Sequence, residues 1–98
     1  MSNYLLSPEK ISDLQDIYLF TIGEWGEKQA EKYLDEIYAA FDRLTQHPSI
    51  GRSRGELSTG LRSFPIGAHV IFFMPWQNDI AIARVLHGAR DVESVFGE

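Results

Sequence analysis

The sequence predicts an α+β fold in which two helices pack on one face of an antiparallel β-sheet. Two observations support this prediction. The first half of the 98-residue chain carries apolar residues at helical spacing, and the stretch from Gly60 to Arg90 alone has enough apolar, β-type residues to build a sheet. The expected element order is β-α-α-β-β-β-α, in one domain that spans residues 1–98.

The chain is expected to begin with a short strand at Asn3 to Leu6 and to continue into a helix. Ser7 is the expected N-cap and Pro8 the first helical residue, because proline lacks the amide hydrogen that would be unsatisfied there. Gly23 and Gly26 mark the end of this helix. Its apolar stripe consists of Ile11, Leu14, Tyr18 and Ile22, with Ile17 and Trp25 alongside and Asp13, Gln15 and Asp16 turned away.

A second helix is expected from about Glu27 to Gln46. Pro48 cannot continue a helix and disfavours helical geometry at His47, so the helix is expected to end there. The short link between the helices makes them an antiparallel hairpin, and Ser49 to Ser58 is expected to be a loop. The apolar face of the second helix carries Ala30, Tyr33, Leu34, Ile37, Phe41 and Leu44.

Three antiparallel strands are expected at Leu61–Phe64, Ala68–Met74 and Ile80–His87. Side chains alternate across a strand, which places Arg84 on the same face as Ile82 and Leu86. Both faces of this sheet are apolar, whereas a sheet with a single covered face alternates apolar with polar residues. The hairpin is expected to cover one face. The rest of the chain is expected to leave much of the other face exposed, and that face is expected to bind a partner.

The last part of the chain is expected to form a short helical turn. Asp91 can cap it, and Val92, Val95 and Phe96 then point back toward the body of the molecule. This segment follows directly on the last strand. The stretch from His87 to Phe96, together with the arginines of the sheet, is where we place the candidate functional surface.

Composition narrows the classes of function. The chain has no cysteine and no apolar run long enough to cross a membrane, so neither a disulfide framework nor a membrane span is expected, and a cytoplasmic location is the simplest interpretation. Residues 1–50 hold four Lys and Arg against nine Asp and Glu, whereas residues 51–98 hold five of each. An acidic first half argues against direct nucleic-acid binding. Arginines on a neutral sheet suit a carboxylate-bearing partner.

The sequence contains no recognisable catalytic set. His69 and His87 are expected on one face of the sheet, where a histidine pair can bind a metal or act as acid and base, but a hydrogen-bonded structural role is favoured. No serine lies in a nucleophile elbow and no glycine pattern indicates a nucleotide site. Among the aromatic residues of the sheet, Phe72 is expected in the core. For Phe73 and Trp76 a core role and a surface role both stay open.

Several short motifs occur in a fixed order along nearly the whole chain. They are Ser7-Pro8, Ala30-Glu31-Lys32-Tyr33, His47-Pro48 with Gly51-Arg52, Gly60-Leu61-Arg62-Ser63-Phe64, His69-Val70-Ile71-Phe72-Phe73 and Arg84-Val85-Leu86-His87-Gly88-Ala89-Arg90-Asp91. Their order and spacing make the combination more specific than any one of them. In this combination the chain resembles one known family, the ParE toxins of type II toxin–antitoxin systems.

This resemblance implies the RelE/ParE-like fold, a ParD-like antitoxin that wraps the toxin, and DNA gyrase, through its A subunit, as the target whose inhibition blocks replication. It implies action by protein binding, with no enzymatic activity, cofactor or metal. An acidic antitoxin segment would pair with the sheet arginines. The residues expected to bind partners are Arg62, His69, Phe73, Arg84, His87, Arg90 and Phe96.

Two alternatives remain at this point. RelE-type toxins of the same superfamily cleave messenger RNA on the ribosome, but their basic cleft is absent here. Where they carry an arginine on the middle strand this chain has His69, and where they tend to have a tyrosine near the end it has Phe96. Those departures count against RNA cleavage. The second alternative is a binding module of the same fold without toxicity.

Overall fold

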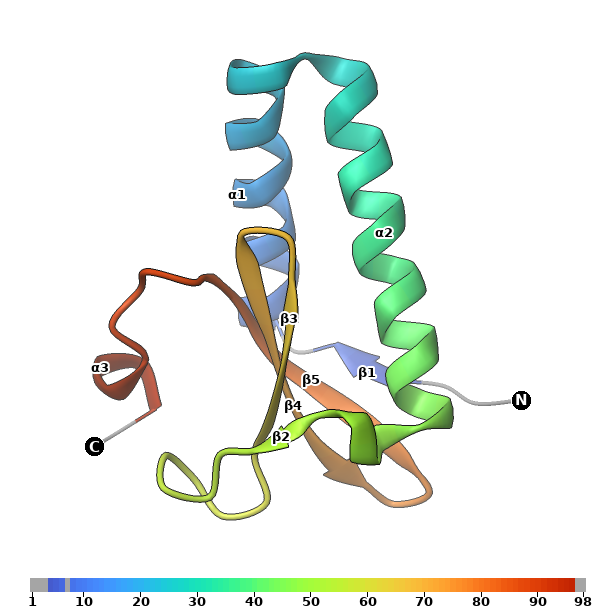
Figure 1. Cartoon of the computed structure of the whole chain (residues 1–98), viewed down its shortest axis with the longest axis vertical. Coiled ribbons are helices and arrows are strands. Elements are labelled where there is room, and N and C mark those ends of the chain that lie inside the picture. The colour runs from blue at the N-terminus through green and yellow to red at the C-terminus, as the bar shows by residue number, and fades with distance from the viewer. Residues whose placement is uncertain (1–3, 7, 97–98) are drawn as a thin grey trace.

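The computed structural model describes residues 4–6 and 8–96, and its element order is the predicted one with a short extra strand. The predicted N-cap Ser7 and the start of the first strand at Asn3 lie outside the described residues. Figure 1 shows the elements β1 (Tyr4–Leu6), α1 (Pro8–Trp25), α2 (Glu27–Gln46), the 3-10 turn η1 (Pro48–Ile50), β2 (Arg52–Ser53), β3 (Arg62–Ile66), β4 (His69–Trp76), β5 (Asp79–His87) and α3 (Val92–Phe96).

The described strands form a sheet in the order β1-β5-β4-β3-β2. The pairs from β5 to β2 are antiparallel, and β1 lies parallel to β5. β2 pairs only two residues with β3 and falls inside the region predicted as a loop. β3 continues past its predicted end at Phe64, because the turn begins at Gly67, whose φ of +55° favours glycine. The sheet is therefore antiparallel except at its N-terminal edge.

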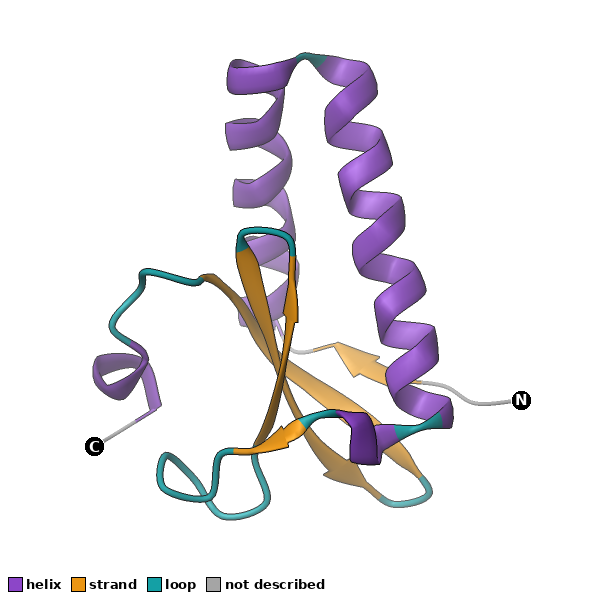
Figure 2. Cartoon of the chain, in the orientation of Figure 1, coloured by secondary structure: helices purple, strands orange, loops and turns teal. Residues whose placement is uncertain are grey.

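The helical hairpin covers one face of this sheet, as predicted. In Figure 2 α1 and α2 stand side by side, and the end where they meet extends past the β3–β4 turn. None of the described helices is both long and apolar enough to span a membrane. The core between hairpin and sheet consists of Leu14, Ile17, Ile37, Ala40, Phe41, Leu44, Ile71, Phe73, Ile80, Ile82 and Val85.

The buried face of α1 is narrower than its predicted apolar stripe. Leu14, Ile17 and Thr21 are buried, whereas Ile11 is 48% exposed and Trp25 is 71% exposed. Asp13 was expected to turn away from the core, and it is instead only 7% exposed. Apolar side chains of α1 therefore remain at the surface of the hairpin.

The prediction that the second face of the sheet lacks cover is wrong at its centre. Leu61, Phe72 and Leu86 are nearly inaccessible there, beneath apolar side chains of α3 and of the loop before β3. The rings of Phe72 and Phe96 lie 4.9 Å apart, and the Arg54 guanidinium lies 5.7 Å from the centre of the Phe72 ring. Figure 1 shows α3 well apart from the other two helices. The chain thus supplies its own second layer.

A β-bulge also changes the predicted faces of β5. Phe72 pairs with Arg84 and Phe73 with Ile82, which leaves Ala83 as the extra residue. Val85 therefore joins the core beneath the hairpin, and Leu86 packs on the other face. The expectation that Ile82, Arg84 and Leu86 share a face is wrong for this reason.

Candidate partner-binding surfaces

Arg84, a predicted partner-binding residue, is bound within the chain. Its Nε donates to Asp13 Oδ2 at 2.7 Å and its Nη2 donates to Asp13 Oδ1 at 2.9 Å, while the Val85 amide also donates to Oδ2 at 2.9 Å. The Arg84 side chain is 24% exposed and that of Asp13 only 8%. Within the described residues, β1 pairs with β5 at Ile80–Ile82, and the Asp13 carboxylate binds the edge of β5 farther along, at Val85.

Arg62 is bound within the chain as well. Its guanidinium donates to the carbonyl oxygens of Pro48 at 3.2 Å and Ser49 at 3.4 Å, and also to that of Gly51. These carbonyls belong to the turn after α2, so Arg62 fastens that turn to β3. A partner carboxylate would have to compete with these bonds.

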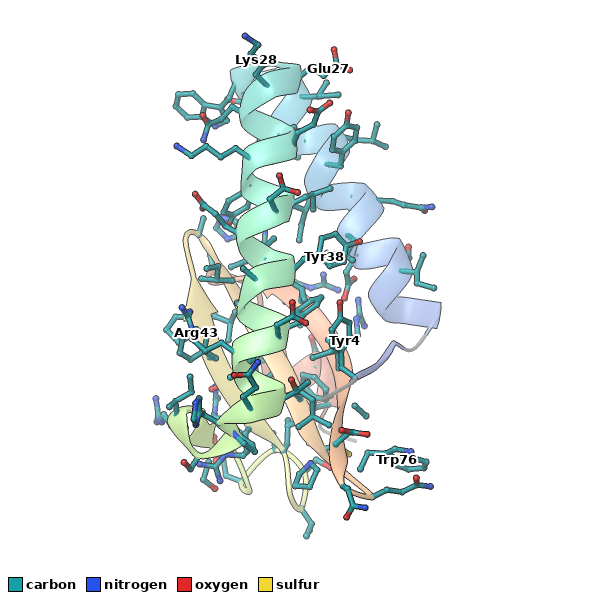
Figure 3. All side chains as sticks on the ribbon, turned by 90° about the vertical axis from the view of Figure 1, so that its right-hand side faces the viewer. Tyr4, Glu27, Lys28, Tyr38, Arg43 and Trp76 are labelled. Atoms are coloured by element: carbon teal, nitrogen blue, oxygen red, sulfur yellow. The ribbon has the colours of Figure 1, made fainter. Side chains whose placement is uncertain are left out.

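The two phenylalanines predicted to bind partners both pack inside the molecule. Phe73 is completely buried beneath the hairpin, so it belongs to the core and does not reach a partner in this conformation. Phe96 is half-buried and lies against Phe72 on the second face. Trp76, in contrast, is 49% exposed, and Figure 3 shows it at the β4–β5 end of the sheet, far from the tip of the hairpin.

His69 and His87 lie opposite each other on β4 and β5, as predicted, with ring centres 5.5 Å apart. Tyr33 of α2 connects this pair to the hairpin. Its hydroxyl donates to the Ile66 carbonyl at 3.0 Å, accepts the Ala68 amide at 3.2 Å and lies 2.7 Å from His69 Nδ1. No three His, Asp or Glu side chains gather as metal ligands in the described part of the chain.

Burial sets the protonation of this cluster. It lowers the pKa of His69 below the usual 6.5, and the neighbouring His87 lowers it further. Burial also raises the pKa of Tyr33 above 10.0. At neutral pH the imidazole of His69 is therefore uncharged and the Tyr33 hydroxyl keeps its proton.

Both histidines line a pocket of about 460 Å³ below the tip of the hairpin. We call it the histidine pocket, and it is lined by Phe20, Thr21, Trp25, Gln29, Tyr33, Ala68, His69 and His87. A smaller hollow adjoins it at His69 and His87 and is also lined by Arg90, Asp13 and Asp16. Of the predicted site residues, the fold thus brings His69, His87 and Arg90 together.

A second depression runs between α1 and α2 and was not predicted as a site. This hairpin groove has a volume of about 560 Å³ and is lined by Ile11, Leu14, Gln15, Tyr18, Leu19, Leu34 and Tyr38. Leu19 is 66% exposed and Tyr38, which Figure 3 labels on α2, is 39% exposed. The groove therefore presents exposed apolar surface, a feature that is common at binding sites.

Comparisons with known proteins show which family the chain belongs to. Residues 4–92 match the family model described as the ParE toxin of type II toxin–antitoxin system, parDE. The chain belongs to the ParE toxin family. The resemblance drawn from the sequence motifs is therefore confirmed.

Two ParE relatives and one solved structure extend the match over almost the whole chain. The chain is 40% identical to Toxin ParE1 of Mycobacterium tuberculosis over 93 residues, or 94% of this chain and 95% of the relative. It is 32% identical to Toxin ParE1 of Caulobacter vibrioides over 97 residues, covering 99% and 100%. A structure described as the chromosomal ParDE TA system from P. aeruginosa matches with a TM-score of 0.76 at 21% identity, covering 89% of this chain and 96% of the other, which shows the shared fold.

One signal in the sequence could have located the hairpin groove of this ParE-family chain. A helix that packs on a sheet needs one apolar stripe, but α1 carries Leu19 and Phe20 outside its predicted stripe. Both are more than 60% exposed, Leu19 beside the hairpin groove and Phe20 at the histidine pocket. Apolar residues beyond the stripe required for the fold were the signal of this exposed apolar surface.

Proposed function

We propose that this chain is a ParE toxin that inhibits DNA gyrase in the cytoplasm by binding its A subunit, so that replication is blocked. A ParD-like antitoxin binds the toxin and neutralises it. Both activities are protein binding, and neither needs catalysis by the toxin. Family membership supports the toxin role, and the single structural observation that carries the proposal is the exposed apolar surface of the hairpin.

The antitoxin is proposed to occupy the hairpin groove. The groove lies between the two helices of the hairpin and is almost wholly apolar, which suits the apolar side of an amphipathic helix. Leu19 and Tyr38 are exposed at this groove, and Gln15 supplies a polar group at its side. We propose the groove as the antitoxin site in place of the second face of the sheet, because the chain covers that face with its own α3.

The toxic surface is proposed to lie in the segment from His87 to Phe96. Arg90 is the exposed cation of this segment and stands next to the hollow at His69 and His87. It differs from Arg62 and Arg84, which bind groups of their own chain. Of the predicted partner-binding residues, His69, His87 and Arg90 therefore keep that proposed role.

The experiment separates the two surfaces with two substitutions. Leu19→Asp places a charge in the hairpin groove and should abolish capture of the co-expressed antitoxin while leaving gyrase inhibition intact. Arg90→Ala should weaken inhibition of gyrase supercoiling by the purified chain while antitoxin capture is unchanged. Lys28→Ala, at the exposed start of α2 and outside both surfaces, is the control variant for both assays and should change neither.

Several results would contradict the proposal. If the chain cleaves messenger RNA on ribosomes and has no effect on gyrase, its toxic activity is that of a nuclease and the gyrase proposal is wrong. Normal growth of a sensitive bacterium during induction of the chain without antitoxin would remove the toxin role. If the Leu19→Asp variant still captures the antitoxin, the hairpin groove is not the antitoxin-binding site.

A further inference from the structure

The hydrogen bonds of Tyr33 determine which nitrogen of His69 carries its proton. A phenol has one hydrogen to donate, and two acceptors compete for it, the Ile66 carbonyl at 3.0 Å and His69 Nδ1 at 2.7 Å. Both contacts are hydrogen bonds only when the hydroxyl donates to the Ile66 carbonyl, so we assign its hydrogen there. The contact of 2.7 Å to His69 Nδ1 is then a hydrogen bond only if Nδ1 is the donor. The neutral imidazole of His69 therefore has its hydrogen on Nδ1 and a lone pair on Nε2.

His87 is held in the opposite tautomer. Its Nδ1 accepts the backbone amide of Ala89 at 3.1 Å, so this nitrogen has no hydrogen of its own. The proton of the neutral ring is therefore on Nε2. No hydrogen bond joins either Nε2 to a described protein group, and both rings line the histidine pocket. The ring nitrogens that remain for a ligand are therefore one acceptor, on His69, and one donor, on His87.

A donor and an acceptor on adjacent strands match one common chemical group. A carboxamide carries an N–H donor and a C=O acceptor side by side, so it can donate to His69 Nε2 and accept from His87 Nε2 at once. A carboxylate only accepts, which would set its oxygen against the lone pair of His69. Three aromatic side chains, those of Phe20, Trp25 and Tyr33, also line the pocket and would contact the apolar part of such a ligand.

We propose that the histidine pocket binds the side-chain carboxamide of a glutamine or asparagine of the antitoxin. This inference rests on the proposed function, because it names one anchoring group of the same partner. The antitoxin would then contact α1 from both sides, through the hairpin groove and through this pocket. A partner seated here would also cover His87 and the adjoining hollow at Arg90, which would link antitoxin binding to occlusion of the proposed toxic segment.

The charged groups around the pocket also favour a neutral carboxamide over a carboxylate at neutral pH. Asp13 and Asp16 of α1 line the adjoining hollow, and Arg90 lies beside it. Asp13 is paired with Arg84, whereas Asp16 is exposed and would repel an anion. Protonation of His69 on Nε2 at low pH would turn its acceptor into a donor, and the pocket would then favour a carboxylate over a carboxamide.

The test uses the purified full chain and two small probes, 3-phenylpropanamide and 3-phenylpropanoate. They share the aromatic body and differ in the group that meets the histidines. At pH 7.5 the amide should bind about tenfold more tightly than the carboxylate, measured by NMR titration, because only the amide satisfies both rings. When the pH is lowered until the nitrogen-15 spectrum shows that His69 is protonated, the order should reverse. Nitrogen-15 spectra of the histidine rings should show the Nδ1–H form of His69 and the Nε2–H form of His87 at pH 7.5.

Matched variants locate the effect. His69→Phe and His87→Phe keep an aromatic ring and should each weaken amide binding about tenfold, and His47→Phe, on a histidine outside the pocket, should not change it. Tyr33→Phe removes the hydroxyl that fixes His69 and should reduce the amide preference and change the tautomer signal. His87 is exposed, so its variant keeps the test valid if substitution of the half-buried His69 prevents folding.

The proposal is overturned if the two probes bind equally at pH 7.5, if neither binds, or if amide binding survives both histidine substitutions. These outcomes are distinct from a failure of the proposed function. The fragment titration needs neither gyrase nor antitoxin, so a chain that is not toxic can still bind the amide. Conversely, a toxic chain that is neutralised by its antitoxin can fail this titration.

Discussion

At the scale of single residues, Asp13 shows how one side chain fixes the position of α1 on the sheet. It binds Arg84 through both carboxylate oxygens and also accepts the Val85 amide. We expect Asp13→Asn to lower the free energy of unfolding by about 2 to 3 kcal/mol, less than for a fully buried pair because Arg84 is 24% exposed. Urea unfolding measures this. Asp16→Asn, at an exposed position of the same helix, should change it by less than about 0.5 kcal/mol, and equal effects would refute the role given to Asp13.

Gly67 allows Tyr33 to reach the β3–β4 turn. Its φ is +55°, and a Cβ there would lie 2.7 Å from the Tyr33 Cε1 and Oη atoms. Gly60 has a similar φ of +83° but no atom within 4 Å of a Cβ. We therefore expect Gly60→Ala to cost about 1 kcal/mol from backbone strain alone and Gly67→Ala to cost about 2 to 3 kcal/mol. Thermal unfolding of the two variants compares them, and a smaller cost at Gly67 would contradict the close contact.

His69 should make the stability of the free chain depend on pH. Its pKa is lower in the folded chain than the usual 6.5, so the unfolded chain binds more protons as the pH falls below that value. Folding stability should therefore decrease between pH 6.5 and the lower pKa of the folded state, and this contribution should be constant at higher pH. Urea unfolding at about pH 7.5 and about pH 5.5 should show a larger decrease for the unsubstituted chain than for His69→Phe. The same decrease in both would remove His69 as the cause.

At the scale of elements, α3 acts as the cover of the second sheet face. Its apolar side chains lie over Leu61, Phe72 and Leu86, and the Phe96 ring contacts Phe72. We expect Phe96→Ala to lower the free energy of unfolding by about 1 to 2 kcal/mol, since a half-buried ring loses its apolar contact. Denaturant unfolding tests this against Glu93→Ala, at an exposed position of the same helix, which should change stability by less than about 0.5 kcal/mol. No loss in Phe96→Ala would mean that α3 leaves the face open in solution.

At the scale of the whole molecule, net charge opposes binding to nucleic acid. The chain carries a formal charge of −5, and nine of its acidic residues lie in the half that contains the hairpin. We expect no binding of a short DNA duplex or a single-stranded RNA in gel-shift assays at low salt, where electrostatic attraction is strongest. Binding that weakens steeply with added salt would contradict this and would favour the nuclease alternative.

Much of the element order could be predicted because local patterns specify it. The apolar spacing of α2 matches its buried residues from Ala30 to Leu44, and Pro48 follows directly on the helix end at His47. The two histidines were placed on one face from the alternation of side chains along their strands, and their pairing across β4 and β5 confirms this. The ParE family was recognised from motifs that extend along nearly the whole chain.

The positions of the site residues were harder to predict, because side-chain roles depend on contacts between distant segments. Arg62 and Arg84 were expected to bind a carboxylate partner, but carbonyls after α2 and Asp13 on α1 occupy them. The bulge at Ala83 reversed the expected faces of β5 without any glycine or proline to signal it. Phe73 was a surface candidate in the sequence, and the hairpin above it makes it part of the core.

The fold class, the hairpin and the family could all be read from the order of the amino acids, because periodic apolar residues and backbone breakers act over a few neighbouring positions. Which surface remains free depended on tertiary packing. Side chains of α3 and of a loop cover the second face of the sheet, whereas Leu19, Phe20 and Trp25 of the hairpin stay exposed. The surface that stays exposed is therefore decided only when the helices and the sheet pack together, because burial depends on contacts between distant segments.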